Sequence, residues 1–241
     1  MDRGIVRALI LATGITLAGL LTGWGFARAR SADRFVTVKG ISEREVTADV
    51  AVWPLRLVTA SNDLAGAHTE LQRHVTLVRT FLEAQGIDTS QVSLQGFVVT
   101  DALANPYAQA ERVASRYVIR QTVLVRSSDP QRVLAASQRV ADLVNAGVII
   151  SSGEEYGPGG PTFIFTQLNA LKPEMLAEST ARAREAAQQF ARDAESGLGS
   201  IRRANQGVFE ILPRAAGPGM TEESQILKNV RVVSTVEYFL D

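Results

Sequence analysis

Two adjacent serines followed by two glutamates are the residues in this chain whose types most suggest chemistry. Ser151 and Ser152 precede Glu154 and Glu155, which places hydroxyl groups near carboxylates. A serine hydroxyl becomes a nucleophile when an adjacent base accepts its proton, and many hydrolases present it in a G-x-S-x-G turn. The chain has neither that turn nor a histidine near these serines in the sequence. A hydrolase that uses Ser151 or Ser152 is therefore the weakest of three functional hypotheses.

Carboxylates and histidines elsewhere do not form a metal-binding pattern. Glu43, Glu45 and Asp49 lie close in sequence, but no histidine or cysteine joins them, and a solvated strand face explains them better. The only histidines, His68 and His74, are six residues apart, or about 240° around a helix, so they face different ways. We predict no catalytic residue, no cofactor or cofactor-binding residue, and no metal ligand.

Bulk composition argues against further classes of function. The 25 Lys and Arg residues balance the 25 Asp and Glu residues, so a net charge of zero gives no electrostatic case for a nucleic-acid partner. The absence of cysteine excludes disulfides, thiolate metal sites and a cysteine nucleophile. The glycine-rich segment 157–161 lacks the Lys-Ser/Thr pair of a phosphate-binding loop.

The segment 35–58 contains the clearest structural pattern and is typical of two strands. Alternation of apolar and polar residues from position 46 onward predicts a strand with one buried face. The side chains expected on that face are Val46, Ala48, Val50 and Val52. Pro54 cannot donate to a strand ladder, so it favours an edge strand or a bulge at this point.

Three segments of this chain resemble the SIMPL-domain family, which includes the YggE-type periplasmic proteins. They are VTVKGISEREVTADVAVWPL at 36–55, RRANQGVF at 202–209 and VRVVSTVEY at 230–238. The resemblance covers the chain from about residue 35 to the C-terminus. It implies the fold of that family, export of the domain to the periplasm, ring-like or barrel-like assembly, and a link to oxidative-stress tolerance. These motifs specify strands, so the resemblance transfers no catalytic residue.

Helices are expected between the strands because apolar residues recur at helical spacing and glycine follows each run. The predicted helices span 61–85, 129–147 and 173–196. Ser61 or Asn62 would cap the first helix, and Pro173 would begin the third. The inner face of the third helix is expected to comprise Leu176, Ala183, Ala187, Phe190 and Ala194.

The remaining strands define the predicted fold class. They are expected at 91–100, 115–125, 148–151, 162–168, 202–212 and 230–240. Alternating strands favour an α+β fold, in which a mainly antiparallel sheet has three helices packed on one face. The opposite sheet face would meet solvent, an aqueous channel or another subunit. Its expected residues include Arg120, Thr122, Thr235 and Glu237.

The N-terminal segment 1–34 is expected to be a signal anchor that precedes a SIMPL-like domain at 35–241. Residues 8–27 form an uncharged run long enough for a helix of about 30 Å, and a single transmembrane helix is therefore predicted. A cleaved signal peptide is the alternative, because Ala27-Arg28-Ala29 fits a cleavage site. Arginines flank both ends of the run and do not decide its orientation.

These observations predict a non-enzymatic protein of the cell envelope. The expected arrangement is a single-pass inner-membrane protein, held through residues 8–27, with a soluble periplasmic domain that forms homo-oligomers and is linked to oxidative or envelope stress. The alternative is a module that binds a small apolar ligand. In that case, the loops at 101–112 and 155–161 would form the rim of the site.

Overall fold

The computed structural model of this chain describes residues 3–31, 34–104, 114–151 and 160–241. The described chain forms antiparallel sheets with helices, so the predicted α+β class is confirmed. Two sheets are present among the described residues where one was expected, and the chain divides into two compact units. The first unit comprises 1–43, 172–210 and 231–241, and the second comprises 44–171 and 211–230. Each unit is described by itself.

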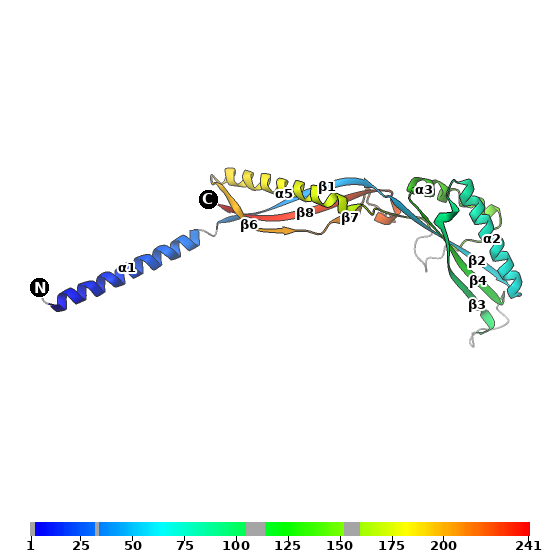
Figure 1. Cartoon of the computed structure of the whole chain (residues 1–241), viewed down its shortest axis with the longest axis horizontal. Coiled ribbons are helices and arrows are strands. Elements are labelled where there is room, and N and C mark those ends of the chain that lie inside the picture. The colour runs from blue at the N-terminus through cyan, green and yellow to red at the C-terminus, as the bar shows by residue number, and fades with distance from the viewer. Residues whose placement is uncertain (1–2, 32–33, 105–113, 152–159) are drawn as a thin grey trace. The chain divides into compact units, whose positions relative to one another are not determined.

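The sheet of the second unit has the strand order β3-β4-β2-β5. Its strands are β2 (Val50–Ser61), β3 (Val92–Asp101), β4 (Tyr117–Ser127) and β5 (Thr162–Ile164). Every pairing between these neighbours is antiparallel. Helices α2 (Leu64–Ala84) and α3 (Pro130–Gln138) cover one face of this sheet, as Figure 1 shows.

Strand β2 supplies much of the core of this unit. Alternate side chains of β2 are almost fully buried, and they are Ala51, Trp53, Leu55 and Leu57. The predicted buried face was therefore wrong at Val50 and Val52, which are only half-buried. The pattern changes phase because β1 (Phe35–Thr47) ends before Ala48 and β2 begins after Asp49, so the two strands do not share one alternation. The expectation of an edge strand or a bulge at Pro54 was wrong, because β2 lies between β4 and β5 and Pro54 is opposite Leu124 in a continuous register. Pro54 lies beyond the three β2 residues that pair with β5.

Helix α2 packs its apolar stripe on the sheet as predicted. Six apolar residues recur at helical spacing from Leu64 to Leu82. Leu64 is exposed, and the other five are buried, namely Ala67, Leu71, Val75, Val78 and Leu82. The cap is Asp63 and not Ser61 or Asn62, because its carboxylate accepts hydrogen bonds from the N–H groups of Ala65 and Gly66. Gly86 has a φ of +74°, as expected for the residue that ends the helix.

Two predicted elements of this unit differ in the structure. The expected helix at 129–147 is divided into α3 and the short α4 (Ala141–Asn145), with Asp129 capping α3. The expected strand at 148–151 forms only an isolated bridge between Ile150 and Leu57. Its backbone nevertheless remains attached to β2, because the Ser151 N–H donates to the carbonyl of Arg56 at 2.8 Å.

The other sheet has the strand order β1-β8-β6, and β7 also pairs with β8. Besides β1, the strands of this sheet are β6 (Leu198–Gln206), β7 (Glu210–Pro213) and β8 (Leu227–Leu240). The single strand expected at 202–212 is thus two strands, separated at Gly207. The Gly207 N–H donates to the carbonyl of Val233 on β8 at 2.9 Å, and a Cβ at this glycine would lie 2.6 Å from the same oxygen.

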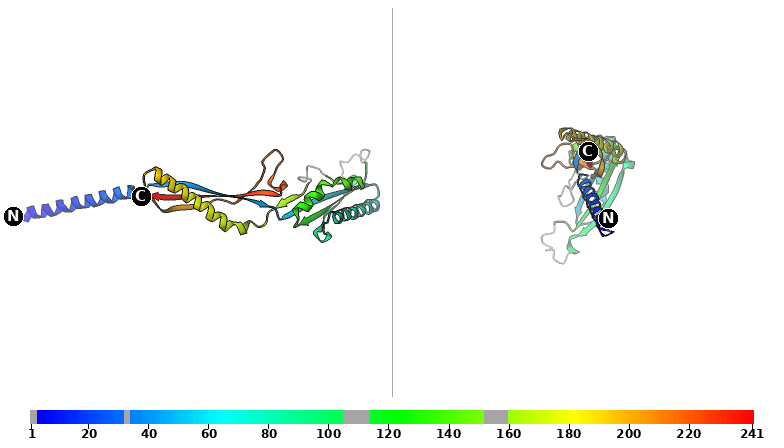
Figure 2. Two further views of the ribbon diagram at one scale, coloured as in Figure 1. Left: turned by 90° about the horizontal axis from the view of Figure 1, so that it is seen from above. Right: turned by 90° about the vertical axis from the view of Figure 1, so that its left-hand side faces the viewer.

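Helix α5 (Leu168–Asp193) lies along this sheet and differs from the predicted third helix in two ways (Figures 1 and 2). It begins before Pro173, which lies in its second turn and removes only one backbone hydrogen bond there. Its buried stripe repeats every fourth residue and consists of Met175, Ser179, Ala183, Ala187 and Ala191. Phe190 was wrongly placed on the inner face, since 58% of it is exposed.

The small residues of α5 allow the helix backbone to approach β1 directly. A Cβ built on Gly40 of β1 would lie 1.8 Å from the carbonyl oxygen of Ser179 and 2.5 Å from the backbone nitrogen of Ala183. The Ser179 hydroxyl also lies 2.7 Å from the Ser234 hydroxyl on β8. The small residues of α5 therefore permit close packing of the helix on the sheet.

Residues 8–27 lie within the helix α1 (Arg3–Ser31). Within the part of the chain that the structure describes, no helix is long and apolar enough to cross a bilayer. The prediction of a transmembrane helix at 8–27 is therefore not supported by the structure.

The substitution Gly40→Ala should destabilise the first unit by roughly 3 kcal/mol or more, because its methyl group has to displace backbone atoms of α5. Chemical denaturation followed by circular dichroism measures the loss. Gly14→Ala is the control, since a Cβ at Gly14 meets nothing within 4 Å. Unchanged amide-hydrogen exchange in α5 of the Gly40 variant would contradict this account of the packing.

Candidate functional site

The acidic residues considered as metal ligands are dispersed among structural partners. Glu43 lies 3.4 Å from Arg231, and Glu45 lies 2.9 Å from Arg214. No group of three or more potential metal ligands occurs among the described residues. The paired glutamates thus act as ordinary ion pairs near the strand surface.

Asp49 has a separate structural role at the start of β2. Its carboxylate accepts hydrogen bonds from the backbone N–H of Thr166 at 2.8 Å and from the Thr166 hydroxyl at 2.7 Å. Burial raises the pKa of Asp49, but these hydrogen bonds outweigh burial and leave the pKa below its ordinary value. Asp49 therefore fixes the segment that follows β5.

The two histidines of α2 face different ways, as predicted. His74 is buried, and its Nε2 lies 3.1 Å from a carboxylate oxygen of Glu70. His68 is exposed and meets the ring of Phe97 edge-on at 6.2 Å between centroids.

Of the two serines considered as nucleophiles, Ser151 lines a pocket, and Ser152 lies outside the described residues. The pocket has a volume of about 270 Å³ and lies on the face of the second unit's sheet opposite to α2. It is lined by Arg56, Leu57, Val58, Gly96, Val98, Arg120, Gln121, Thr122 and Ser151. No histidine lies among these lining residues, so Ser151 has no imidazole base there.

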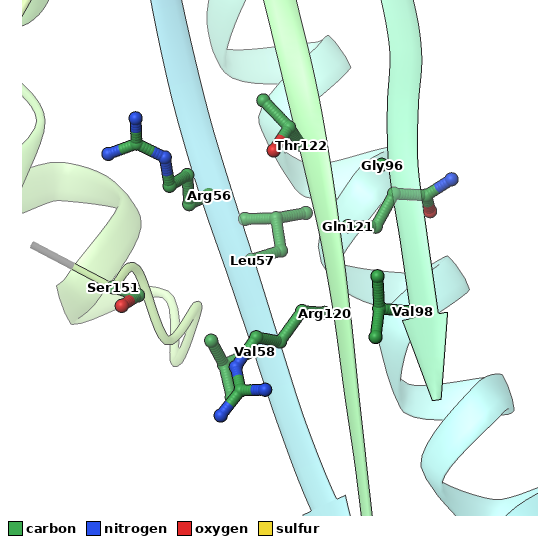
Figure 3. Close-up of a pocket in the computed structure, with 9 residues that line it drawn as sticks. All are labelled: Arg56, Leu57, Val58, Gly96, Val98, Arg120, Gln121, Thr122 and Ser151. Atoms are coloured by element: carbon green, nitrogen blue, oxygen red, sulfur yellow. The ribbon is translucent and has the colours of Figure 1, made fainter. Parts of the chain in front are cut away.

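Strand register explains why the pocket-lining side chains gather. Arg56 is opposite Thr122, and Val58 is opposite Arg120, so these four side chains share the sheet face that points away from the core. In Figure 3 the Arg56 and Arg120 side chains extend toward the side of β2 on which Ser151 lies. The Gln121 side chain points away from both arginines.

A β-bulge shapes the wall of the pocket on β3. Gln95 pairs with Thr122 and Val98 pairs with Arg120, so two residues of β3 oppose one residue of β4. Gly96 lies in this bulge with a φ of +61°, a conformation that glycine adopts without strain. Because Gly96 has no side chain, the pocket stays open above Thr122.

Positive charge predominates on the strands around the pocket. Strands β2, β3 and β4 carry three arginines, at 56, 120 and 126, and a single acidic residue, Asp101. Asp101 is already paired with Arg116, at 3.1 Å between Oδ2 and Nη2. Arg120 is exposed, and no described residue forms an ion pair with it.

The outer edge of β3 is the second notable feature of this sheet. Strand β3 is terminal in the strand order, and no described strand pairs with its outer side. Residues 92–100 contain neither a charged residue nor proline. Four of their apolar side chains are between 39% and 50% exposed, namely Leu94, Phe97, Val98 and Val99.

Sequence reasoning did not find this pocket. The loops at 101–112 and 155–161 were the predicted rim, and their described parts, 101–104 and 160–161, do not line the pocket. The available signal was the alternation of β4, which correctly placed Arg120 and Thr122 opposite the buried Ile119 and Val123. The prediction that Arg120 and Thr122 share a face with Thr235 and Glu237 was wrong, since the latter lie in β8.

Antiparallel sheets with helices on one face occur in proteins of many different functions, so this architecture by itself indicates no activity. The model of the SIMPL family, described as a protein of unknown function (DUF541), matches residues 36–237. The chain therefore belongs to the SIMPL family, as its strand motifs predict. No curated protein matches it.

The Asp101–Arg116 pair at the end of β3 predicts a defined pH dependence. Hydrogen bonds from Arg116 lower the pKa of Asp101 below its ordinary value. The charged pair therefore stabilises the folded state above the unfolded pKa of about 3.9, and this stabilisation is lost as pH falls through the lower folded-state pKa. Asp101→Asn should flatten the stability profile below about pH 4, and Arg116→Gln should do the same in urea denaturation at each pH. A profile that keeps its full slope in both variants would contradict the assignment.

Proposed function

We propose that this chain is a non-enzymatic envelope protein whose SIMPL domain works by self-association. The observation that carries the proposal is the exposed, uncharged and apolar edge of β3. An unpaired strand edge presents a row of N–H and C=O groups that pair readily with another strand. Proteins that remain monomeric commonly protect such edges with lysine, proline or bulges. In β3 only the bulge at Gly96 serves this purpose.

The geometry favours pairing between two copies of the same strand. The opposite end of the sheet offers only the short β5, whereas β3 has ten residues. Antiparallel pairing of β3 with β3 of a second copy is an isologous contact with two-fold symmetry, which is the commonest arrangement in homo-oligomers. Such pairing closes as a dimer, and a larger ring or barrel requires a further surface.

The proposal includes the cellular setting expected from the sequence. The uncharged run at 8–27 would hold the chain at the inner membrane as a single-pass protein, with the SIMPL domain in the periplasm. The resemblance to YggE-type proteins supports this orientation and a link to oxidative or envelope stress. Self-association near a membrane needs little affinity, since anchoring raises the local concentration of the domain.

A second candidate function is ligand binding in the pocket beside Arg56 and Arg120. The specific observation that favours it is a hollow whose lining combines apolar and polar residues, as small-molecule sites do. This function is compatible with self-association because the pocket lies on the sheet face and the pairing groups lie on the edge.

The absence of cysteine from the chain allows a clean test of self-association by single-cysteine cross-linking. Leu94→Cys and Val99→Cys should each yield a covalent dimer of the full chain in membranes, seen on non-reducing gels. Val144→Cys is the matched control, because Val144 is 59% exposed in α4, away from β3. Equal cross-linking at all three positions would indicate random collision and would refute an interface at β3.

A charge at the edge should weaken the same contact. Val99→Lys places a cation on the outer strand, and a lysine there disfavours pairing of that edge with another strand. We expect at least a tenfold increase in the dimer dissociation constant, measured by analytical ultracentrifugation of the full chain in a neutral detergent. Val144→Lys should leave the constant unchanged, and an unchanged constant for Val99→Lys would contradict the proposed interface.

A further inference from the structure

We propose that a hollow at the outer edge of β5 binds a small organic cation, with its ammonium group beside Glu223 and its apolar body seated against Phe165 and Ile211. The hollow has a volume of about 330 Å³, and all of its lining residues belong to the second unit. It shares no lining residue with the pocket beside Arg56 and Arg120. The inference therefore goes beyond both candidate functions.

The hollow lies where β5 ends the sheet. Strand β5 is terminal in the strand order, and no described strand pairs with its outer side. The one-turn helix η5 (Glu222–Ser224) packs against β5 instead. A turn of helix cannot continue the backbone pairing of a sheet, so the two elements meet through side chains. The space between them is lined by residues 162–165, Ile211, Glu222 and Glu223.

Both walls of the hollow are held in place by the protein itself. On one side, the Asp49 N–H donates to the Ile164 carbonyl at 3.0 Å, and the Asp49 carboxylate accepts from the Thr166 N–H at 2.8 Å. On the other side, the buried Lys228 ammonium donates to the Glu222 carbonyl at 2.6 Å and pairs with the carboxylate of the same residue. A site that is already ordered loses little conformational entropy when a ligand binds.

The charge of the lining favours a cation. Glu222 and Glu223 are acidic, and none of the lining residues is basic. Lys228 neutralises Glu222, but Lys228 is fully buried and does not line the hollow. Glu223 is exposed, and no described residue forms an ion pair with it. One uncompensated carboxylate therefore borders the hollow.

The other side chains favour an apolar body on the same ligand. Phe165 and Ile211 are half-buried, and Ile164 is 41% exposed, so apolar surface borders the hollow. A phenylalanine ring packs well against a second aromatic ring, and its face attracts an ammonium group. The volume of about 330 Å³ lies at the lower end of the range of roughly 300–1,000 Å³ typical of ligand pockets, which suits a ligand the size of benzylamine.

The test uses the full chain in a neutral detergent and 4-fluorobenzylamine as the probe, with binding followed by fluorine NMR line broadening. We expect saturable binding that benzylamine displaces and that weakens as salt is added, because salt screens exposed charges. Benzyl alcohol lacks the charge, methylamine lacks the apolar body, and benzoate has the opposite charge. Each of these should displace the probe at least about threefold less effectively than benzylamine, as expected for losing one exposed ion pair or one apolar contact.

Glu223→Gln should weaken binding of the probe by about threefold or more, because it removes the charge and keeps the shape of the side chain. Glu83→Gln is the matched control, since Glu83 is an exposed glutamate of α2 in the same unit and does not line the hollow. It should leave the affinity unchanged. Glu222→Gln is avoided because it would leave the buried Lys228 ammonium without its carboxylate partner and destabilise the fold.

Phe165→Leu tests the position of the apolar body, because it removes the ring and keeps an apolar side chain. It should also weaken binding of the probe, whereas unchanged affinity in this variant would place the ligand elsewhere and refute the site. Absence of saturable binding, equal effects of Glu83→Gln and Glu223→Gln, or displacement by benzyl alcohol as effective as displacement by benzylamine would each overturn the proposal.

Discussion

The burial of one face of β2 beneath α2 is the constraint on which the second unit depends. Trp53, Leu55 and Leu57 are almost fully buried on this face, and the side chains between them are forced onto the other face. Within the described residues, helices cover the core face alone. The same alternation that builds the core therefore also presents Arg56 and Val58 outward, and the antiparallel register aligns Arg120 and Thr122 beside them. The core and the pocket of this sheet thus arise from one periodic pattern.

The first unit relies on a different kind of contact. Its helix α5 presents serine and alanine to the sheet, and a glycine of β1 meets the helix backbone directly. Small side chains provide little apolar area, so close backbone approach and dispersion contacts replace the burial of large residues there.

Sequence periodicity predicted the fold class, the stripe of α2 and the two faces of β4, because each depends on neighbours within one element. It failed where tertiary contacts decide the outcome. The phase change between Ala48 and Val50 follows from a strand break, and the exposure of Phe190 follows from the rotation of α5 set by Gly40. The pocket was missed because its residues come from β2, β3, β4 and the segment at Ser151, and only strand register brings them together. Gly96, a glycine within the expected strand at 91–100, was the one local sign of the bulge in β3.

Neither unit is built from a continuous stretch of chain, and this has a consequence for biosynthesis. In the first unit, β1 pairs with β8, which follows it much later in the sequence, so the sheet lacks its central strand until β8 has been synthesised. The second unit also needs residues 211–230. Contacts between such distant segments form slowly, because a long loop must close first. Both units therefore become complete only after the segments beyond residue 210 have been synthesised.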